Sequence, residues 1–191
     1  MTTIVPPYEA VSVSLPDDAW RPAVPVVRCS ESCRSPEHLR AVVAQFNVAT
    51  AHRYAPRDSA TFCNIFAWDV TSAMGCEVPH WVDSEGHPAK MGPPNHELDI
   101  NEALAWLRST GPHPYGWREV DAVEAELQAS AGHPTLVVLR EQPHGHVAVV
   151  MPSRPGTPGL RVSQAGARCF TDEPLSHGFG SKGPLHFFSH P

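Results

Sequence analysis

The stretch TFCNIFAWDVTSAMG, residues 61–75, decides the fold. Its apolar side chains recur at the spacing of one helix face: Phe62, Phe66, Val70, Ala73 and Met74. The sequence therefore predicts a helix that begins near Cys63 and stops at Gly75, a residue typical of helix ends. The unpaired N–H groups and the dipole at a helix N-terminus stabilise a thiolate. Cys63 is accordingly a candidate nucleophile.

The chain before this helix is predicted to contain an arm and one further helix. Residues 1–30 are proline-rich and are expected to form an N-terminal arm, with residues 31–191 forming a single domain. The tripeptide Ser35-Pro36-Glu37 provides an N-cap with proline at the first helical position, which predicts a helix over 36–46. Residues 1–20 contain no Lys or Arg and no long apolar run, so we expect no secretory signal peptide.

The chain after residue 75 is predicted to pass from a loop to helices and then to strands. Residues 77–98 are rich in Pro and Gly and predict a long loop. Two pairs of an Asp followed by a Glu three residues later predict helix starts: Asp99 with Glu102, and Asp121 with Glu124. Four β-prone runs then predict an antiparallel meander: Thr135–Leu139, His146–Met151, Leu160–Gln164 and Leu185–Ser189. We expect an α+β fold, with N-terminal helices packed on a C-terminal antiparallel β-sheet.

The composition limits the classes of function. The 191 residues include 14 Lys and Arg and 20 Asp and Glu, for a net charge of −6, with no long run of either sign. Nucleic acid is therefore not expected as a partner, because neutralising phosphates needs a clustered basic face. Hydrophobic residues make up 41% and charged residues 18%, which predicts a soluble globular protein without membrane insertion.

The cysteines and histidines raise two further possibilities, a disulfide and a metal site. There are five cysteines, so at least one is outside any intramolecular disulfide. Cys29 and Cys33 would pair in an oxidising periplasm and leave the other three unpaired. A zinc site at His144 and His146, completed by His80, His87 or Cys76, is an alternative, but neither HExxH nor paired CxxC motifs occur. We expect no metal and no cofactor.

A cysteine nucleophile needs a base, and the base needs a group that orients it. His146 begins one predicted strand and Gln164 ends the next, so antiparallel pairing would bring the amide oxygen to the far ring nitrogen of His146. Ser163 is the alternative third residue. Each residue alone has a structural explanation, since a cysteine at a helix start is often a small buried hydrophobe. Their order along the chain is that of papain-like cysteine hydrolases.

Several blocks of the chain resemble NlpC-type peptidoglycan hydrolases, and more narrowly the branch found among phage-derived and type VI secretion amidase effectors. The blocks are RY (53–54), TFCNIFAWDV (61–70), AMGCEVPHWV (73–82), EL (97–98), AWL (105–107), YGW (115–117), GHVAVV (145–150) and SQAGA (163–167). The resemblance covers about three quarters of the chain and is most specific around Cys63 and His146. It implies a papain-like fold, with Cys63 as nucleophile, His146 as base and Gln164 as the orienting group.

The residues expected around this triad are less strongly indicated. The backbone N–H of Cys63 and the side chain of Tyr54 are the candidate oxyanion donors. Asn64 stands beside the thiol and is a candidate substrate contact. His80 and Trp81 belong to the long loop, where aromatic rings are expected to line the cleft and stack on sugar or peptide.

The resemblance implies an amidase or endopeptidase that cuts peptidoglycan stem peptides through a thioester. The absence of a signal peptide fits a phage-type lysin, or an antibacterial effector that a type VI secretion machine delivers into the periplasm of target bacteria. The expected partners are the stem peptides, a cognate immunity protein and a carrier protein of the secretion machine. Two alternatives stay open: a protein-modifying deamidase, transglutaminase or acyltransferase, and a non-catalytic module that binds the cell wall.

Overall fold

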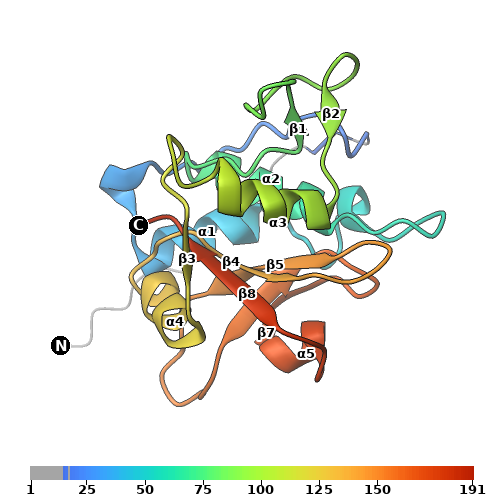
Figure 1. Cartoon of the computed structure of the whole chain (residues 1–191). Helices are drawn as coiled ribbons and strands as arrows, with labels where there is room; N and C mark the ends of the chain where they lie inside the picture. The colour runs from blue at the N-terminus through green and yellow to red at the C-terminus, as the bar shows by residue number, and fades with distance from the viewer. Residues whose placement is uncertain (1–14, 17) are drawn as a thin grey trace.

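The computed structural model describes residues 15–16 and 18–191, so half of the predicted arm lies outside the described residues (Figure 1). The helices are α1 (Pro36–Gln45), α2 (Cys63–Ala73), α3 (Ile100–Ser109), α4 (Ala122–Ser130) and α5 (Leu175–Phe179), with 3-10 turns η1 (Glu31–Cys33) and η2 (His52–Tyr54). The strands are β1 (Trp81–Val82), β2 (His96–Glu97), β3 (Arg118–Val120), β4 (Thr135–Leu139), β5 (His146–Met151), β6 (Arg161–Gln164), β7 (Phe170–Pro174) and β8 (Leu185–Ser189). The chain is therefore a mixed α+β protein, as the sequence predicts.

Six strands form one antiparallel sheet in the order β3-β8-β4-β5-β6-β7. The predicted meander is correct for β4, β5 and β6, which pair in sequence order. It is wrong for the last strand, because β8 lies between β3 and β4, where Phe188 is opposite Leu136. Strand β7, which the sequence pattern does not indicate, occupies the position beside β6. The remaining two strands, β1 and β2, form a separate small hairpin above the helices (Figure 1).

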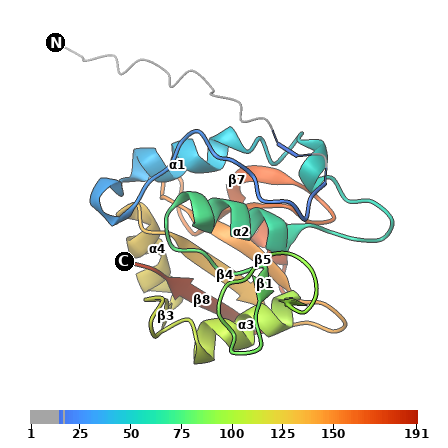
Figure 2. The same ribbon diagram turned by 90° about the horizontal axis from the view of Figure 1, so that it is seen from above.

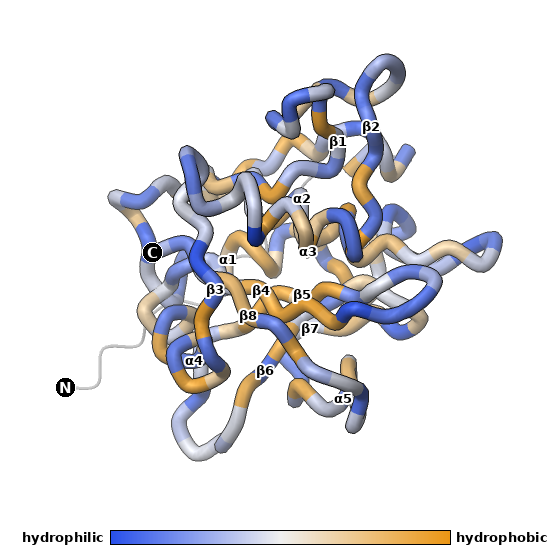
Figure 3. Tube along the Cα trace, viewed as in Figure 1, coloured by the Kyte–Doolittle hydropathy of each residue, from blue (hydrophilic) through white to orange (hydrophobic). Residues whose placement is uncertain are grey.

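Helices cover both faces of the sheet (Figure 1). Alternate residues of β4 point in opposite directions, so Leu136 and Val138 pack with α1, α2 and α3, whereas Val137 and Leu139 pack with α4 and α5. All five residues of β4 are consequently buried. The hydrophobic centre of the sheet and the hydrophilic connecting loops are visible in Figure 3.

Three helices begin with the side-chain caps that the sequence predicts. The Ser35 hydroxyl accepts a hydrogen bond from the backbone N–H of His38, and Asp99 and Glu102 form a reciprocal capping box. Asp121 accepts from the backbone N–H of Glu124. Helix α2 differs, because its N-cap residue is Phe62 and no side chain caps it. The N–H of Ile65 donates to Asn64 Oδ1, and those of Cys63 and Asn64 remain available to other acceptors.

The described N-terminal segment, residues 18–28, lies along α2 in the view of Figure 2. The amide oxygen of Gln45 accepts from the backbone N–H groups of Val26 and Val27. The backbone N–H of Cys29 donates to the carbonyl of Ala73 over 2.9 Å. These contacts attach the segment to α1 and α2.

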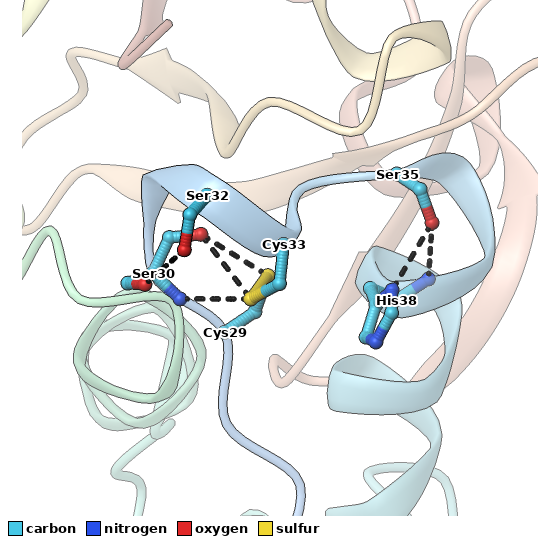
Figure 4. The surroundings of a disulfide bond; sticks show 6 residues. All are labelled: Cys29, Ser30, Ser32, Cys33, Ser35 and His38. Atoms are coloured by element: carbon cyan, nitrogen blue, oxygen red, sulfur yellow. Dashed lines mark hydrogen bonds between the residues drawn. A yellow bond between two sulfur atoms is a disulfide. The ribbon is translucent and has the colours of Figure 1, made fainter.

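A disulfide joins Cys29 and Cys33 across the turn η1 (Figure 4). Their Cα atoms are 5.6 Å apart, within the normal range for a disulfide. The sequence left this pairing open, and the structure contains it, with Cys63, Cys76 and Cys169 as free cysteines. No helix in the described part of the chain is long and apolar enough to cross a membrane.

Candidate functional site

Cys63 is the first residue of α2, and its thiol is buried against the beginning of β5. The backbone N–H groups of Val147, Asn64 and Cys63 itself act on the thiol as hydrogen-bond donors. Burial nevertheless dominates and raises the pKa of the Cys63 thiol above its usual range. At neutral pH the thiol keeps its proton, so it needs a base before it can act as a nucleophile.

His146 and Gln164 meet as the sequence predicts. The Nε2 atom of His146 lies 2.7 Å from the amide oxygen Oε1 of Gln164. The amide nitrogen of Gln164 donates to the carbonyl of Arg168 over 3.0 Å, which fixes the orientation of the amide. Because the amide oxygen only accepts, the neutral imidazole carries its hydrogen on Nε2 and has its lone pair on Nδ1. The ring is thereby prepared to take a proton at Nδ1.

The pair is enclosed by α5 and by the turn after β6. The Phe179 ring lies with its centroid 5.0 Å from that of His146 and shields the pair. A Cβ atom at Gly178 would collide with Gln164 Oε1, and one at Gly166 would lie 3.2 Å from the imidazole. Burial lowers the pKa of His146, and the hydrogen bond with Gln164 opposes this shift in part. His146 is therefore neutral near pH 7.

The structure distinguishes between the two candidates for the third residue. Ser163 is fully buried, and its hydroxyl accepts a hydrogen bond from the backbone N–H of Asp172 over 2.9 Å. Neighbouring residues of a strand point to opposite faces, so Ser163 and Gln164 cannot both face His146. Gln164 is the residue in contact with the imidazole.

Val147, whose backbone N–H acts on the thiol, follows His146 in the chain. Among the described residues, however, His146 does not line the cavity at Cys63, and its ring packs against Phe179 of α5. Helix α2 packs directly on β5. Among the described residues no hydrogen bond joins the thiol directly to the imidazole. Such contacts are often long in a protein without substrate and shorten when it binds.

A cavity of about 320 Å³ opens at Cys63. Its walls come from the loop before α2, the start of α2, the chain from β2 into α3, the loop before β5 and the N-terminal segment. The lining residues are Trp20, Asp58, Ser59, Ala60, Thr61, Phe62, Cys63, Asn64, Ile65, Glu97, Asp99, Ile100, His144 and Gly145. Cys63 and Asn64 therefore face the same space.

Tyr54 corrects the sequence-based expectation of an oxyanion donor. Its hydroxyl is buried and donates to Asp69 Oδ2 over 2.7 Å, and the Arg53 guanidinium binds both oxygens of Asp69. Burial and the neighbouring carboxylate raise the pKa of Tyr54, so the phenol keeps its proton and continues to donate. Tyr54 therefore ties η2 to α2, and its hydroxyl is not directed at the cavity.

His80 and Trp81 are also placed differently from the expectation. Neither lines the cavity at Cys63 within the part of the chain that is described. His80 is buried between Trp68 and Trp81, and its Nε2 lies 2.9 Å from Glu97 Oε1. Glu97, which does line the cavity, thus separates His80 from it.

Sequence reasoning did not assign Trp20, Asp58, Glu97 or Asp99 to the site. Of these four, Trp20 is the most distant from Cys63 in sequence. The only sign in the sequence that it could belong to the site is that a tryptophan occurs within a proline-rich arm. His144 also lines the cavity. No group of three or more His, Cys, Asp or Glu side chains in the described ranges is arranged to hold a metal ion.

A scan against protein-family models finds no match, and a search of curated proteins finds none either.

Proposed function

We propose that this chain is a papain-like cysteine amidase that hydrolyses amide bonds in the stem peptides of bacterial peptidoglycan. The observation that carries the proposal is the 2.7 Å contact between His146 Nε2 and Gln164 Oε1, in a chain whose Cys63 begins a helix and faces a cavity. A base held in one tautomer and a thiol facing a cavity are the components of acyl transfer. The choice of peptidoglycan rests on the resemblance of the Cys63 and His146 blocks to NlpC-type hydrolases.

The reaction proceeds in two half-reactions. In the first, Nδ1 of His146 takes the proton of Cys63 as the sulfur attacks the carbonyl carbon of the amide. The backbone N–H of Cys63 stabilises the resulting oxyanion. The imidazolium then protonates the leaving amine, and the C–N bond breaks to give a thioester. In the second, Nδ1 takes a proton from water, the hydroxide attacks the thioester, and Cys63 recovers its proton as the carboxylic acid leaves.

Delivery to a bacterial periplasm is part of the proposal. The Cys29–Cys33 disulfide supports work in an oxidising compartment, where such bonds persist. We propose an antibacterial effector carried by a type VI secretion machine, or a phage-type lysin. A cognate immunity protein and a carrier of the secretion machine are the partners that this route requires.

The test of the function is digestion of purified peptidoglycan sacculi, with the released fragments identified by mass spectrometry. The wild type is expected to produce new amine and carboxyl ends, whose masses name the bond that is cut. Intact muropeptides, together with rapid labelling of Cys63 by iodoacetamide, would reject peptidoglycan as the substrate and favour protein-modifying acyl transfer.

Replacing Gln164 with alanine is expected to lower kcat by about 10- to 100-fold and to move the acid limb of the pH profile to lower pH. The base works only when unprotonated, so activity falls as the pH drops through the pKa of His146. Burial already lowers that pKa, and Gln164 is the hydrogen-bond partner that raises it. Profiles of kcat/KM between about pH 4 and 8 check this. An acid limb that moves to higher pH would contradict the assigned role.

Gly178→Ala is expected to reduce kcat by about tenfold or more without unfolding the protein. The new methyl group would push against Gln164 Oε1, and the imidazole would lose its orienting partner. Ser176→Ala is the matched control, because Ser176 is exposed on the same helix α5. Steady-state kinetics and thermal melting of both variants test this; equal turnover would show that the Gln164 amide is not critical.

A further inference from the structure

An indole and a carboxylate meet at the cavity, from segments far apart in sequence. The Nε1 atom of Trp20 donates to Glu97 Oε1 over 2.8 Å, and both residues line the cavity with Cys63. The Trp20 ring also packs edge-on against Phe62, with centroids 5.7 Å apart. Trp20 is 37% exposed, although this contact and the hydrogen bond fix its position. The described N-terminal segment therefore contributes a wall of the site.

The Glu97 carboxylate is held in place by two hydrogen-bond donors. Oε1 receives both the Trp20 indole N–H and His80 Nε2, the latter at 2.9 Å. His80 is buried, and its other ring nitrogen, Nδ1, has no hydrogen-bond partner. Burial lowers the pKa of His80, so the ring donates a neutral N–H and does not cancel the carboxylate. Among the described residues no hydrogen bond reaches the second oxygen of Glu97, Oε2.

Carboxylates predominate among the charged side chains that line the cavity, whose described lining also includes His144. Asp58 and Asp99 line the same cavity, and no Lys or Arg is found among the described residues that line it. The guanidinium of Arg57, the residue before Asp58, lies over the Phe62 ring at 4.1 Å and donates to the carbonyls of His52 and Ala55. A cationic group entering the cavity would meet an indole and a carboxylate with an unused oxygen.

We infer that Trp20 and Glu97 form a subsite for an ammonium group of the substrate. A cation is attracted both to the face of an indole and to a carboxylate, and the attraction strengthens where water is partly excluded. The inference rests on the proposed function, because the stem peptides that would reach Cys63 carry ammonium groups at a free N-terminus and on a diamino acid side chain. It makes the N-terminal segment part of substrate recognition.

The test measures binding, so that it does not depend on catalysis. The probes are a synthetic L-Ala-γ-D-Glu-L-Lys tripeptide, its N-terminally acetylated form and its Nε-acetylated form, titrated calorimetrically into the Cys63→Ala protein. We expect one of the two acetylations to weaken binding by about tenfold, and the peptide affected identifies which ammonium group binds. In the Cys63→Ala/Glu97→Gln protein the difference between the free and acetylated peptides is expected to vanish.

Glu97→Gln keeps an oxygen that accepts from Trp20 and His80, so it removes the charge and leaves the shape. Glu85→Gln, an exposed residue of the loop after β1, is the matched control and is expected to keep the tenfold difference. Trp20→Leu in the Cys63→Ala protein is the second variant, and is expected to weaken binding of the free tripeptide severalfold. The subsite is refuted if the three peptides bind equally, if none binds, or if Glu97→Gln preserves the difference. Hydrolysis by the wild type is scored separately, so failure of the amidase proposal is recognised independently.

Discussion

Cys63→Ala is expected to lower the turnover of a peptidoglycan stem peptide by at least about 10³-fold, because no other group at the site can form the thioester. His146→Ala is expected to have an effect of similar size, and the double variant to be no worse than either single variant. Residues that act as a unit are strongly non-additive in this way. The measurement is kcat/KM for release of the new amine, with thermal melting to show that each variant is folded.

Cys169→Ala is the matched control for the nucleophile. Cys169 is also a free cysteine, and its thiol donates to the carbonyl of Tyr54 over 3.2 Å. Turnover is expected to stay within about threefold of the wild type, because a single weak hydrogen bond is lost. If Cys169→Ala lost activity while Cys63→Ala kept it, the nucleophile would be Cys169 and this account would be wrong.

Asp69→Asn is expected to reduce the free energy of unfolding by about 3 to 5 kcal/mol, the usual consequence of leaving a buried charge without its partner. Asp69 is buried and receives two N–H groups of Arg53, at 2.7 and 3.0 Å, and the hydroxyl of Tyr54. The backbone N–H of Ala23 also acts on this carboxylate. Removing its charge therefore weakens the attachment of η2 and of the N-terminal segment to α2.

Urea denaturation of the wild type and the variant measures this loss. Glu85→Gln, which removes an exposed carboxylate, is expected to change the free energy of unfolding by less than about 0.5 kcal/mol. The double variant Arg53→Met/Asp69→Leu is expected to recover part of the stability, since it removes both buried charges together. A change below about 1 kcal/mol in Asp69→Asn would show that the ion pair does not hold these elements together.

Regular side-chain patterns explain why much of the fold was predictable. The strands β4, β5 and β8 have the predicted bounds, α1 begins at its predicted N-cap, and α2 begins at Cys63, as its apolar spacing predicts. The missed elements have weak signals, since β3 has only three residues and β7 has the mixed sequence FTDEP. The position of β8 beside β4 was unpredictable from local patterns, because it depends on which sheet edge is free when the chain returns.

The candidate site likewise has one part that the sequence predicts and one part that it does not. Gln164 could be predicted as the partner of His146 because the order of residues and antiparallel pairing of successive strands are local properties. The direction of the Tyr54 hydroxyl could not, because Asp69 reaches it only through the packing of η2 on α2. Trp20 reaches the cavity through a contact with Glu97, 77 residues away, for which the sequence contains no periodic signal.

The most direct test of the account is to look for the acyl group on Cys63. The wild type is mixed with a stem peptide, the reaction is quenched in acid within its first turnovers, and the intact and digested protein are weighed by mass spectrometry. The account predicts an added mass equal to the acyl part of the peptide, located on the fragment that contains Cys63 and absent from Cys63→Ala. Cleavage of the peptide with Cys63 unmodified, or an adduct on another residue, would contradict it.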